Sequence, residues 1–171
     1  MKPTTGRVRR SLEIAANIAI ILVATVIVGN FVWSKFRPKK TLTAPPVGST
    51  VSLSGVDWEK NGSTLLMVLQ EGCRYCEESA PFYQRLHDQR SGTQPRMVAV
   101  IPGEKSETVR YLTDHGVLAD DVINTSLDDL KVASTPTLLL VDQSGIVKGA
   151  WVGKLDEKRE KEVVQRALNL H

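Results

Sequence analysis

Residues 65–76, LLMVLQEGCRYC, decide the fold, because an unbroken apolar run leads directly to two cysteines. The run at 65–69 is typical of a strand in a sheet that is covered on both faces. A helix is expected to begin at about Arg74. The sequence therefore predicts a strand followed by a helix whose first turn carries Cys73 and Cys76.

The position of Cys73 at the start of a helix favours its thiolate form. The first amide N–H groups of a helix lack intrahelical partners, and the positive end of the helix dipole attracts an anion. Arg74 adds a positive charge beside this cysteine. Cys76 lies one turn further along the same helix face, so its sulfur can reach the sulfur of Cys73. This arrangement predicts that Cys73 attacks a disulfide and that Cys76 resolves the mixed disulfide.

Two other uses of a C-x-x-C pair compete with redox exchange. A zinc site needs four ligands, and His87, His115 and His171 have no spacing that joins them to the cysteines. We expect His87 and His115 to be surface or helix-end residues. A purely structural disulfide would close a loop too small to constrain the unfolded chain strongly. We therefore expect a redox role for the pair, with no metal and no other cofactor.

Further apolar runs predict the rest of an α/β domain. A short alternating stretch at 51–56 suggests a strand or hairpin, and Ser144-Gly145 marks a hairpin turn. The later strands are expected at 97–101, 122–123, 138–141 and 146–152. Parallel strand–helix units followed by a hairpin and a closing helix specify an α/β fold.

Three helices are expected in this domain. The first, from about Arg74, should bury Ala80, Phe82, Tyr83 and Leu86. The second is expected at 104–115, with Val109 and Leu112 facing inward. The third is expected at 154–170 as a closing amphipathic helix.

The dithiol and its surroundings resemble the thioredoxin-like superfamily. The unit formed by the strand, residues 73–76 and the helix matches that family, and Pro81 stands where the family often carries a helix-kinking proline. Thr135-Pro136, just before the run at 138–141, resembles the family's cis-proline, whose loop faces the dithiol. The resemblance therefore implies a cis peptide bond before Pro136.

The resemblance covers about residues 47–171 and implies a central mixed sheet flanked by helices. Gly149 and Gly153 resemble the glycines of the family's final strand. Three positions depart from the usual pattern. Gly72 replaces the tryptophan that usually precedes the first cysteine, and Met67 stands near the position of the family's buried acid. Ser79 stands near the position where the membrane-tethered reductases of this family often carry a glutamate.

The stretch between Cys76 and Pro136 is longer than in minimal thioredoxins. An added strand and helix there look like the membrane-tethered, extracytoplasmic branch, the cytochrome-c-maturation type of reductase. That resemblance implies Cys73 as nucleophile and Cys76 as resolving thiol. It also implies a dithiol electron donor in the membrane. The residues expected to contact substrate are Arg74, Tyr75, Thr135 and Pro136.

Residues 14–33, IAANIAIILVATVIVGNFVW, predict a transmembrane anchor because they contain no charged side chain. A helix of this length spans roughly the 30 Å of a bilayer's hydrocarbon core. Phe31 and Trp33 stand at one end, where interfacial aromatic residues are common. A cleaved signal peptide is the closest alternative, but the small-residue pattern that follows ends at Ala44, directly before Pro45.

Basic residues flank the anchor on both sides and give nearly no bias in orientation. Four lie in the tail at 1–13 and four lie in the linker at 34–50, and the starting amine slightly favours a cytoplasmic tail. Prolines stiffen the linker, and residues 51–171 are expected to form the domain. We expect a single-pass protein of the inner (cell) membrane, with its C-terminal domain facing the periplasm or the cell exterior.

The charge pattern gives no indication of nucleic-acid binding. The net charge of +3 comes from the basic residues around the anchor, which suit lipid headgroups. Expected partners are the bilayer, protein thiols or disulfides, and the dithiol donor. The leading hypothesis is an enzyme that reduces disulfides of exported proteins. A tethered binding module without turnover, and an oxidase or isomerase, remain open, because a redox potential depends on how well the thiolate is stabilised.

Overall fold

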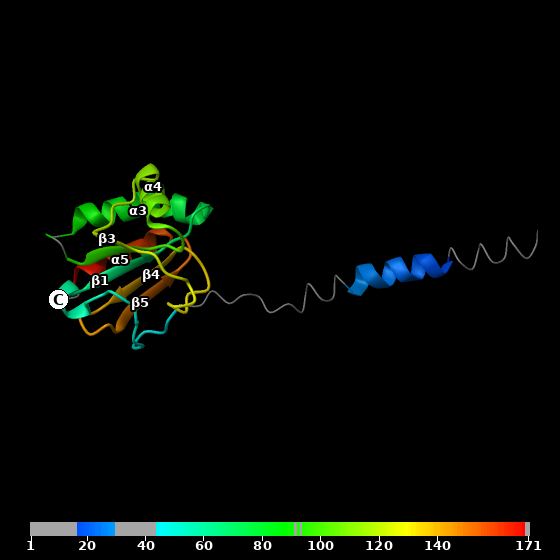
Figure 1. The fold of residues 1–171 in the computed structure, drawn as a ribbon, viewed down its shortest axis with the longest axis horizontal. Coiled ribbons are helices and arrows are strands. Elements are labelled where there is room, and N and C mark those ends of the chain that lie inside the picture. Colours follow the sequence, from blue (N-terminus) through cyan, green and yellow to red (C-terminus); the bar gives the residue numbers. More distant parts are fainter. Residues whose placement is uncertain (1–16, 30–43, 91, 93, 170–171) are drawn as a thin grey trace, which may run out of the picture. The chain divides into compact units, whose positions relative to one another are not determined.

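The computed structural model describes residues 17–29, 44–90, 92 and 94–169 (Figure 1). The chain divides into two compact units, Met1–Lys39 and Lys40–His171. In the first unit residues 17–29 are helical. Among the described residues, no helix is both long enough and apolar enough to cross a membrane. The predicted tail, the ends of the predicted anchor (14–16 and 30–33) and linker residues 34–43 lie outside the described residues.

A five-stranded mixed sheet forms the centre of the second unit (Figure 1). Its strands are β1 (Thr64–Val68), β2 (Arg96–Val100), β3 (Asp121–Ile123), β4 (Thr137–Val141) and β5 (Val147–Val152). They lie in the order β3-β2-β1-β4-β5. β1, β2 and β3 run parallel, whereas β4 is antiparallel to both β1 and β5. The carboxyl ends of β1 and β5 therefore lie beside the amino end of β4.

The α/β fold class and the five strands from residue 64 onward are confirmed, each strand within one residue of its predicted bounds. β1, β2 and β4 are buried along almost their whole length. Continuous apolar runs mark strands of this kind, because both faces of the sheet are covered.

Three helices cover one face of the sheet: α3 (Arg74–Gln89), α4 (Lys105–Asp114) and α5 (Glu157–Leu168). Leu65, Met67 and Leu69 point to this face and share one apolar cluster with all three helices. Right-handed crossovers from β1 to β2 and from β2 to β3 bring α3 and α4 to the same side, as Figure 1 shows. The predicted buried face of α3 is confirmed.

The opposite face of the sheet is covered mainly by irregular segments. Leu66 and Val68 of β1 pack there against Val51 and Leu53 from one segment and Leu130 from another. A short helix, α2 (Trp58–Asn61), follows the first segment, and Trp58 packs against the same cluster.

The strand or hairpin predicted at 51–56 is wrong. The structure has only an isolated bridge between Thr50 and Ile146. The Gly48 and Val51 amides donate to carbonyls at the tip of the β4–β5 hairpin, each over 2.8 Å. The apolar alternation at 51–56 therefore reflects a strap lying on the core rather than a sheet strand. Residues 44–50, predicted as linker, belong to this strap.

The inward position predicted for Val109 on α4 is also wrong. Val109 is 46% exposed, and the buried side chains of α4 are Thr108, Tyr111 and Leu112. Thr108 is held inward because its hydroxyl accepts a 2.8 Å hydrogen bond from the Asn124 side-chain amide. The predicted position of Leu112 is confirmed.

The packing of β5 explains why a glycine stands at position 149, one of the two glycines singled out in the sequence. A Cβ added at Gly149 would lie only 2.8 Å from Cζ3 of the Trp151 indole. The indole is buried in the cluster beneath α5. Gly149 is therefore required by the close approach of Trp151 two residues along the same strand face.

Candidate active site

The two cysteines lie where β1 gives way to α3. Gly72 has a φ of +67°, a backbone conformation that glycine adopts without strain. Cys73 is the N-cap of α3, and Cys76 lies in its first turn. Their sulfurs form a disulfide, with the two Cα atoms 5.2 Å apart. Cys73 is partly exposed whereas Cys76 is 1% exposed, so Cys73 is the sulfur that an incoming group can reach.

Two hydrogen-bond donors approach the Sγ atom of Cys73. The Cys76 amide N–H donates to it over 3.3 Å, and the Thr135 hydroxyl donates to it over 3.4 Å. Hydrogen bonds to a charged form favour that form. After reduction, both donors would stabilise a thiolate on Cys73.

Thr135 reaches Cys73 because the loop before β4 lies beside the end of β1. Val68 of β1 pairs with Thr137 of β4. The Thr135–Pro136 peptide bond is cis, as the resemblance implied. The Pro136 carbonyl accepts a 2.8 Å hydrogen bond from the Gly153 amide, which ties this loop to the end of β5. The predicted residues Cys73, Cys76, Thr135 and Pro136 thus lie together.

Arg74 and Tyr75 are both exposed beside the disulfide, and Tyr75 is 57% exposed. Arg74 Nε donates to Glu78 Oε1 over 2.7 Å, and Lys154 Nζ donates to Glu78 Oε2 over 2.8 Å. The hydrogen bond from Lys154, followed by that from Arg74, lowers the pKa of the Glu78 carboxyl. The same contact with Glu78 raises the pKa of the Arg74 guanidinium. One carboxylate therefore joins two cations at the rim of the site.

Helix α4 contacts the other side of the first turn of α3. His115 Nε2 lies 3.6 Å from Glu77 Oε1, and its Nδ1 lies 2.8 Å from the Tyr111 carbonyl oxygen. Burial, followed by the negative charges of Glu77 and Glu71, raises the pKa of the Tyr111 hydroxyl. Carboxylates therefore gather on the α4 side of the dithiol.

Cys76 lies in apolar surroundings. Met67 is completely buried and belongs to the same apolar cluster as Cys76. Removal from water disfavours a thiolate, so Cys76 is the poorer nucleophile of the pair. Within the described ranges, no group of three or more His, Cys, Asp or Glu side chains could hold a metal ion.

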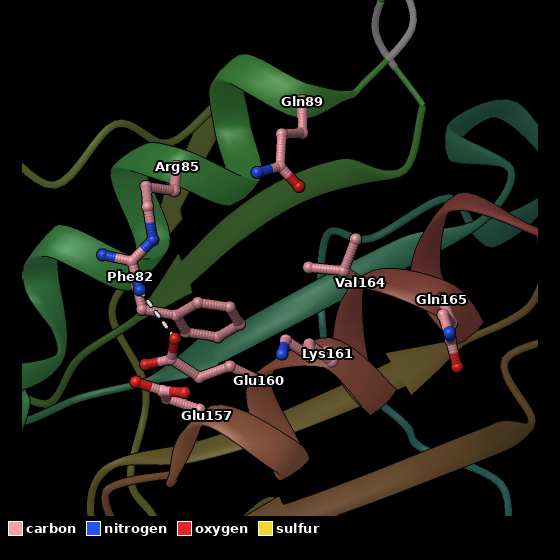
Figure 2. Close-up of a pocket in the computed structure, with 8 residues that line it drawn as sticks. All are labelled: Phe82, Arg85, Gln89, Glu157, Glu160, Lys161, Val164 and Gln165. Atoms are coloured by element: carbon pink, nitrogen blue, oxygen red, sulfur yellow. Dashed lines mark hydrogen bonds and ion pairs between the residues drawn. The ribbon is translucent and has the colours of Figure 1, made fainter.

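A separate cavity of about 650 Å³ lies between α3 and α5 (Figure 2). Phe82 and Val164 contribute its apolar lining, and Arg85 pairs with Glu160 over 2.6 Å at its rim. Neither cysteine lines this cavity. This cavity is therefore separate from the surface around Cys73.

Comparison with known proteins gives matches at the level of structure. No protein-family model matches the chain, and no curated protein matches it in sequence. A thiol-disulfide isomerase from Corynebacterium glutamicum is similar, with a TM-score of 0.56 and 15% identity over 77% of this chain and 99% of that one. The domain has the thioredoxin fold.

Two further thioredoxin-fold structures are similar to this one. A thiol:disulfide interchange protein of the thioredoxin family from Chlorobium tepidum TLS has a TM-score of 0.55 and 19% identity, covering 74% of this chain and 99% of its own. The thioredoxin domain of a thiol-disulfide oxidoreductase from Bacteroides vulgatus has a TM-score of 0.54 and 14% identity, covering 75% of this chain and 100% of its own.

The structure brings together the predicted residues Cys73, Cys76, Thr135 and Pro136, but the sequence analysis missed Lys154 and His115. Lys154 and His115 reach the first two turns of α3 from distant parts of the chain. For Lys154 the sequence offered one indication of a place near the site, because this residue directly follows Gly153, which resembles a glycine of the family's final strand. For His115 its place after α4 gave no indication of a contact with Glu77.

Proposed function

We propose that the chain is a membrane-anchored thiol–disulfide oxidoreductase that reduces disulfides of exported proteins. The observation that carries this proposal is the Cys73–Cys76 disulfide at the start of α3, with two donors on the Cys73 sulfur. A helix start and nearby hydrogen-bond donors stabilise the thiolate that exchange requires. The names of the similar structures, an isomerase and an interchange protein, are consistent with such chemistry.

In the reductive direction the dithiol form begins the reaction. The Cys73 thiolate attacks one sulfur of the substrate disulfide, forming a mixed disulfide and releasing one substrate thiolate, which takes up a proton. Cys76 then loses its proton and attacks Cys73 Sγ. This step breaks the mixed disulfide, releases the second substrate thiol and forms the Cys73–Cys76 disulfide. The substrate gains two electrons, and a dithiol donor in the membrane returns two to the enzyme.

Substrate contact is assigned to the residues that surround the exposed sulfur. An extended segment of the substrate binds along the backbone of Thr135 with Pro136 shaping the groove, and Arg74 and Tyr75 contact it on the helix side. The carbonyl oxygen of Thr135 lies 3.6 Å from Cys73 Sγ, so a segment paired with this residue would bring its own cysteine next to the nucleophile.

The direction of electron flow can be tested by measuring the reduction potential of the Cys73–Cys76 pair. The full-length chain in a nonionic detergent is equilibrated with glutathione or dithiothreitol buffers. We expect a value near that of thioredoxin, about −270 mV, which makes the pair a reductant. A value near about −120 mV would make it an oxidant and overturn the reductive direction. If the pair did not exchange with the buffers, a binding module without turnover would be the better explanation.

We further propose that the apolar segment 14–33 anchors the protein in the cell membrane, with the domain in the periplasm or outside the cell. The absence of charge over 14–33 supports the anchor, and a redox-active disulfide suits an oxidising compartment. Added protease should digest residues 51–171 in right-side-out membrane vesicles and leave them intact in inverted vesicles. The reverse pattern would refute this orientation, and release of the chain by carbonate washing would refute the anchor.

A further inference from the structure

Glu78 holds two cations at the rim of the dithiol site, and each cation keeps donors available. Arg74 contacts Glu78 through Nε, and its side chain is 84% exposed. A guanidinium carries five N–H donors, so its terminal amino groups can bind another acceptor. Lys154 is 47% exposed and carries three donors. Two positive charges share one carboxylate, which leaves this cluster with an excess positive charge.

The two cations gather at one carboxylate beside the surface where substrate is expected. Arg74 directly follows Cys73 on α3. Lys154 directly follows Gly153, whose amide binds the Pro136 carbonyl. Since the Thr135 hydroxyl contacts Cys73 Sγ, Arg74 and Lys154 each directly follow a residue that borders the surface which a substrate cysteine must approach.

The charges around the dithiol are unevenly distributed. The carboxylates of Glu77 and Glu71 lie on the α4 side. Glu77 lies beside His115, and the negative charges of both carboxylates contribute to the raised pKa of the Tyr111 hydroxyl. The cations gather instead at Glu78, which joins Arg74 of α3 to Lys154, the residue that follows Gly153. A segment bound along Thr135 would therefore meet positive charge.

A purely structural role for the Arg74–Glu78–Lys154 cluster is the competing explanation. Exposed ion pairs contribute little to stability, because solvent screens them and the side chains lose freedom. The cluster would then join α3 to the β5–α5 connection without affecting substrate choice. The two roles differ in what they predict for substrates of different charge.

We propose that Arg74 and Lys154 form an acid-recognising rim that favours substrates with an acidic side chain next to the reactive cysteine. Glu78 is a positioning residue that holds both cations and competes with the substrate carboxylate for them. This inference rests on the proposed exchange activity and adds the class of substrate, an acidic peptide segment.

The test uses three disulfide-linked peptides that differ only at the residues beside cysteine, which are Glu, Gln or Lys. The pre-reduced full-length chain in nonionic detergent reduces each peptide, and the second-order rate constants are compared. Each rate constant is divided by that of dithiothreitol with the same peptide, because peptide charge alters the intrinsic reactivity of the disulfide. We expect the Glu peptide to react about three- to tenfold faster than the Gln peptide, and the Lys peptide to react more slowly. Near 1 M salt, where the screening length falls to about 3 Å, the preference should disappear.

Substitutions distinguish substrate recognition by Arg74 and Lys154 from a purely structural role of the cluster. Arg74→Gln and Lys154→Gln should each reduce the Glu-to-Lys rate ratio, whereas Glu78→Gln should increase it, because both cations are released. Arg85→Gln is the matched control. It removes a similar pair, Arg85–Glu160, about 16 Å further along α3, and should leave the ratio unchanged. If the cluster were purely structural, Glu78→Gln would lower the rate constants of all three peptides by the same factor and leave the Glu-to-Lys rate ratio unaltered.

The outcomes distinguish this inference from the proposed function. Failure to reduce the Gln peptide would count against exchange activity itself. Reduction of all three peptides at equal corrected rates would overturn the acid-recognising rim and leave exchange activity intact. A ratio that shifted equally in Arg85→Gln and Lys154→Gln would also overturn it, because the effect would then belong to the overall charge of the protein.

Discussion

Replacement of Cys73 by serine should reduce disulfide exchange by about a thousandfold or more, because loss of a nucleophile removes most of the rate enhancement of an enzyme. Cys73 is the accessible sulfur, at the N-cap of α3. A serine hydroxyl there could still accept the hydrogen bonds from Thr135 and Cys76 but would not attack a disulfide. The measurement is the rate of reduction of a neutral disulfide peptide by the full-length chain.

Replacement of Cys76 by serine should give a different result, and the comparison tests the assigned roles. The Cys73 thiolate can still attack, but no second thiol is present to release the substrate. A mixed disulfide between Cys73 and the substrate should therefore accumulate and be visible on a non-reducing gel. The double variant Cys73→Ser/Cys76→Ser is the control and should trap nothing. Trapping by Cys73→Ser but not by Cys76→Ser would mean that the roles of the two cysteines are exchanged.

Most of the domain could be predicted from local sequence. The strands are recognisable because both faces of the sheet are covered, so that runs such as 65–69 contain no polar residue. Cys73, Cys76 and the start of α3 are close in sequence, and their geometry follows from the helix start itself. The approach of Thr135 to Cys73 spans 62 residues, and it was reached through the resemblance of Thr135-Pro136 to a known loop.

The features that could not be predicted depend on tertiary placement. The apolar alternation at 51–56 is that of a strand, but the strap at 44–56 follows the shape of one sheet face through single contacts such as Val51 and Leu53. Lys154 and Glu78 are 76 residues apart, and nothing in either local sequence indicates the other. The ion pairs that shape the rim of the site therefore appear only once the fold is known.

Replacement of Asp120 by alanine should lower the free energy of unfolding by about 3 kcal/mol, which corresponds to roughly 10 °C in Tm. Arg90 donates to Asp120 through both terminal nitrogens, over 2.8 Å in the contact with Oδ1. The Arg90 side chain is only 7% exposed. The Met97 amide also donates to Asp120, over 2.7 Å. Removing this carboxylate leaves a buried guanidinium without its counter-charge, which is the costly way to break such a pair.

The neighbouring residue supplies the control for this stability prediction. Asp121 is 54% exposed and lies 3.5 Å from Arg96. Asp121→Ala should change the free energy of unfolding by less than about 0.5 kcal/mol, because exposed pairs contribute little. Urea unfolding of the full-length chain in nonionic detergent, followed by tryptophan fluorescence, measures both variants. Equal effects of the two substitutions would contradict a special role for the Arg90–Asp120 pair.

The pH dependence of the same pair gives an independent check. Burial acts to raise the pKa of Asp120, but the hydrogen bonds from Arg90 and Met97 outweigh it, so the pKa is lowered on folding. A lowered carboxyl pKa contributes stability that is present above the unfolded value, about 3.9, and is lost as the pH falls through the folded value. The stability difference between the wild type and Asp120→Ala should therefore be constant near neutral pH and shrink below about pH 4. A difference that persisted undiminished in acid would mean that Asp120 stabilises the end of α3 by packing rather than by charge.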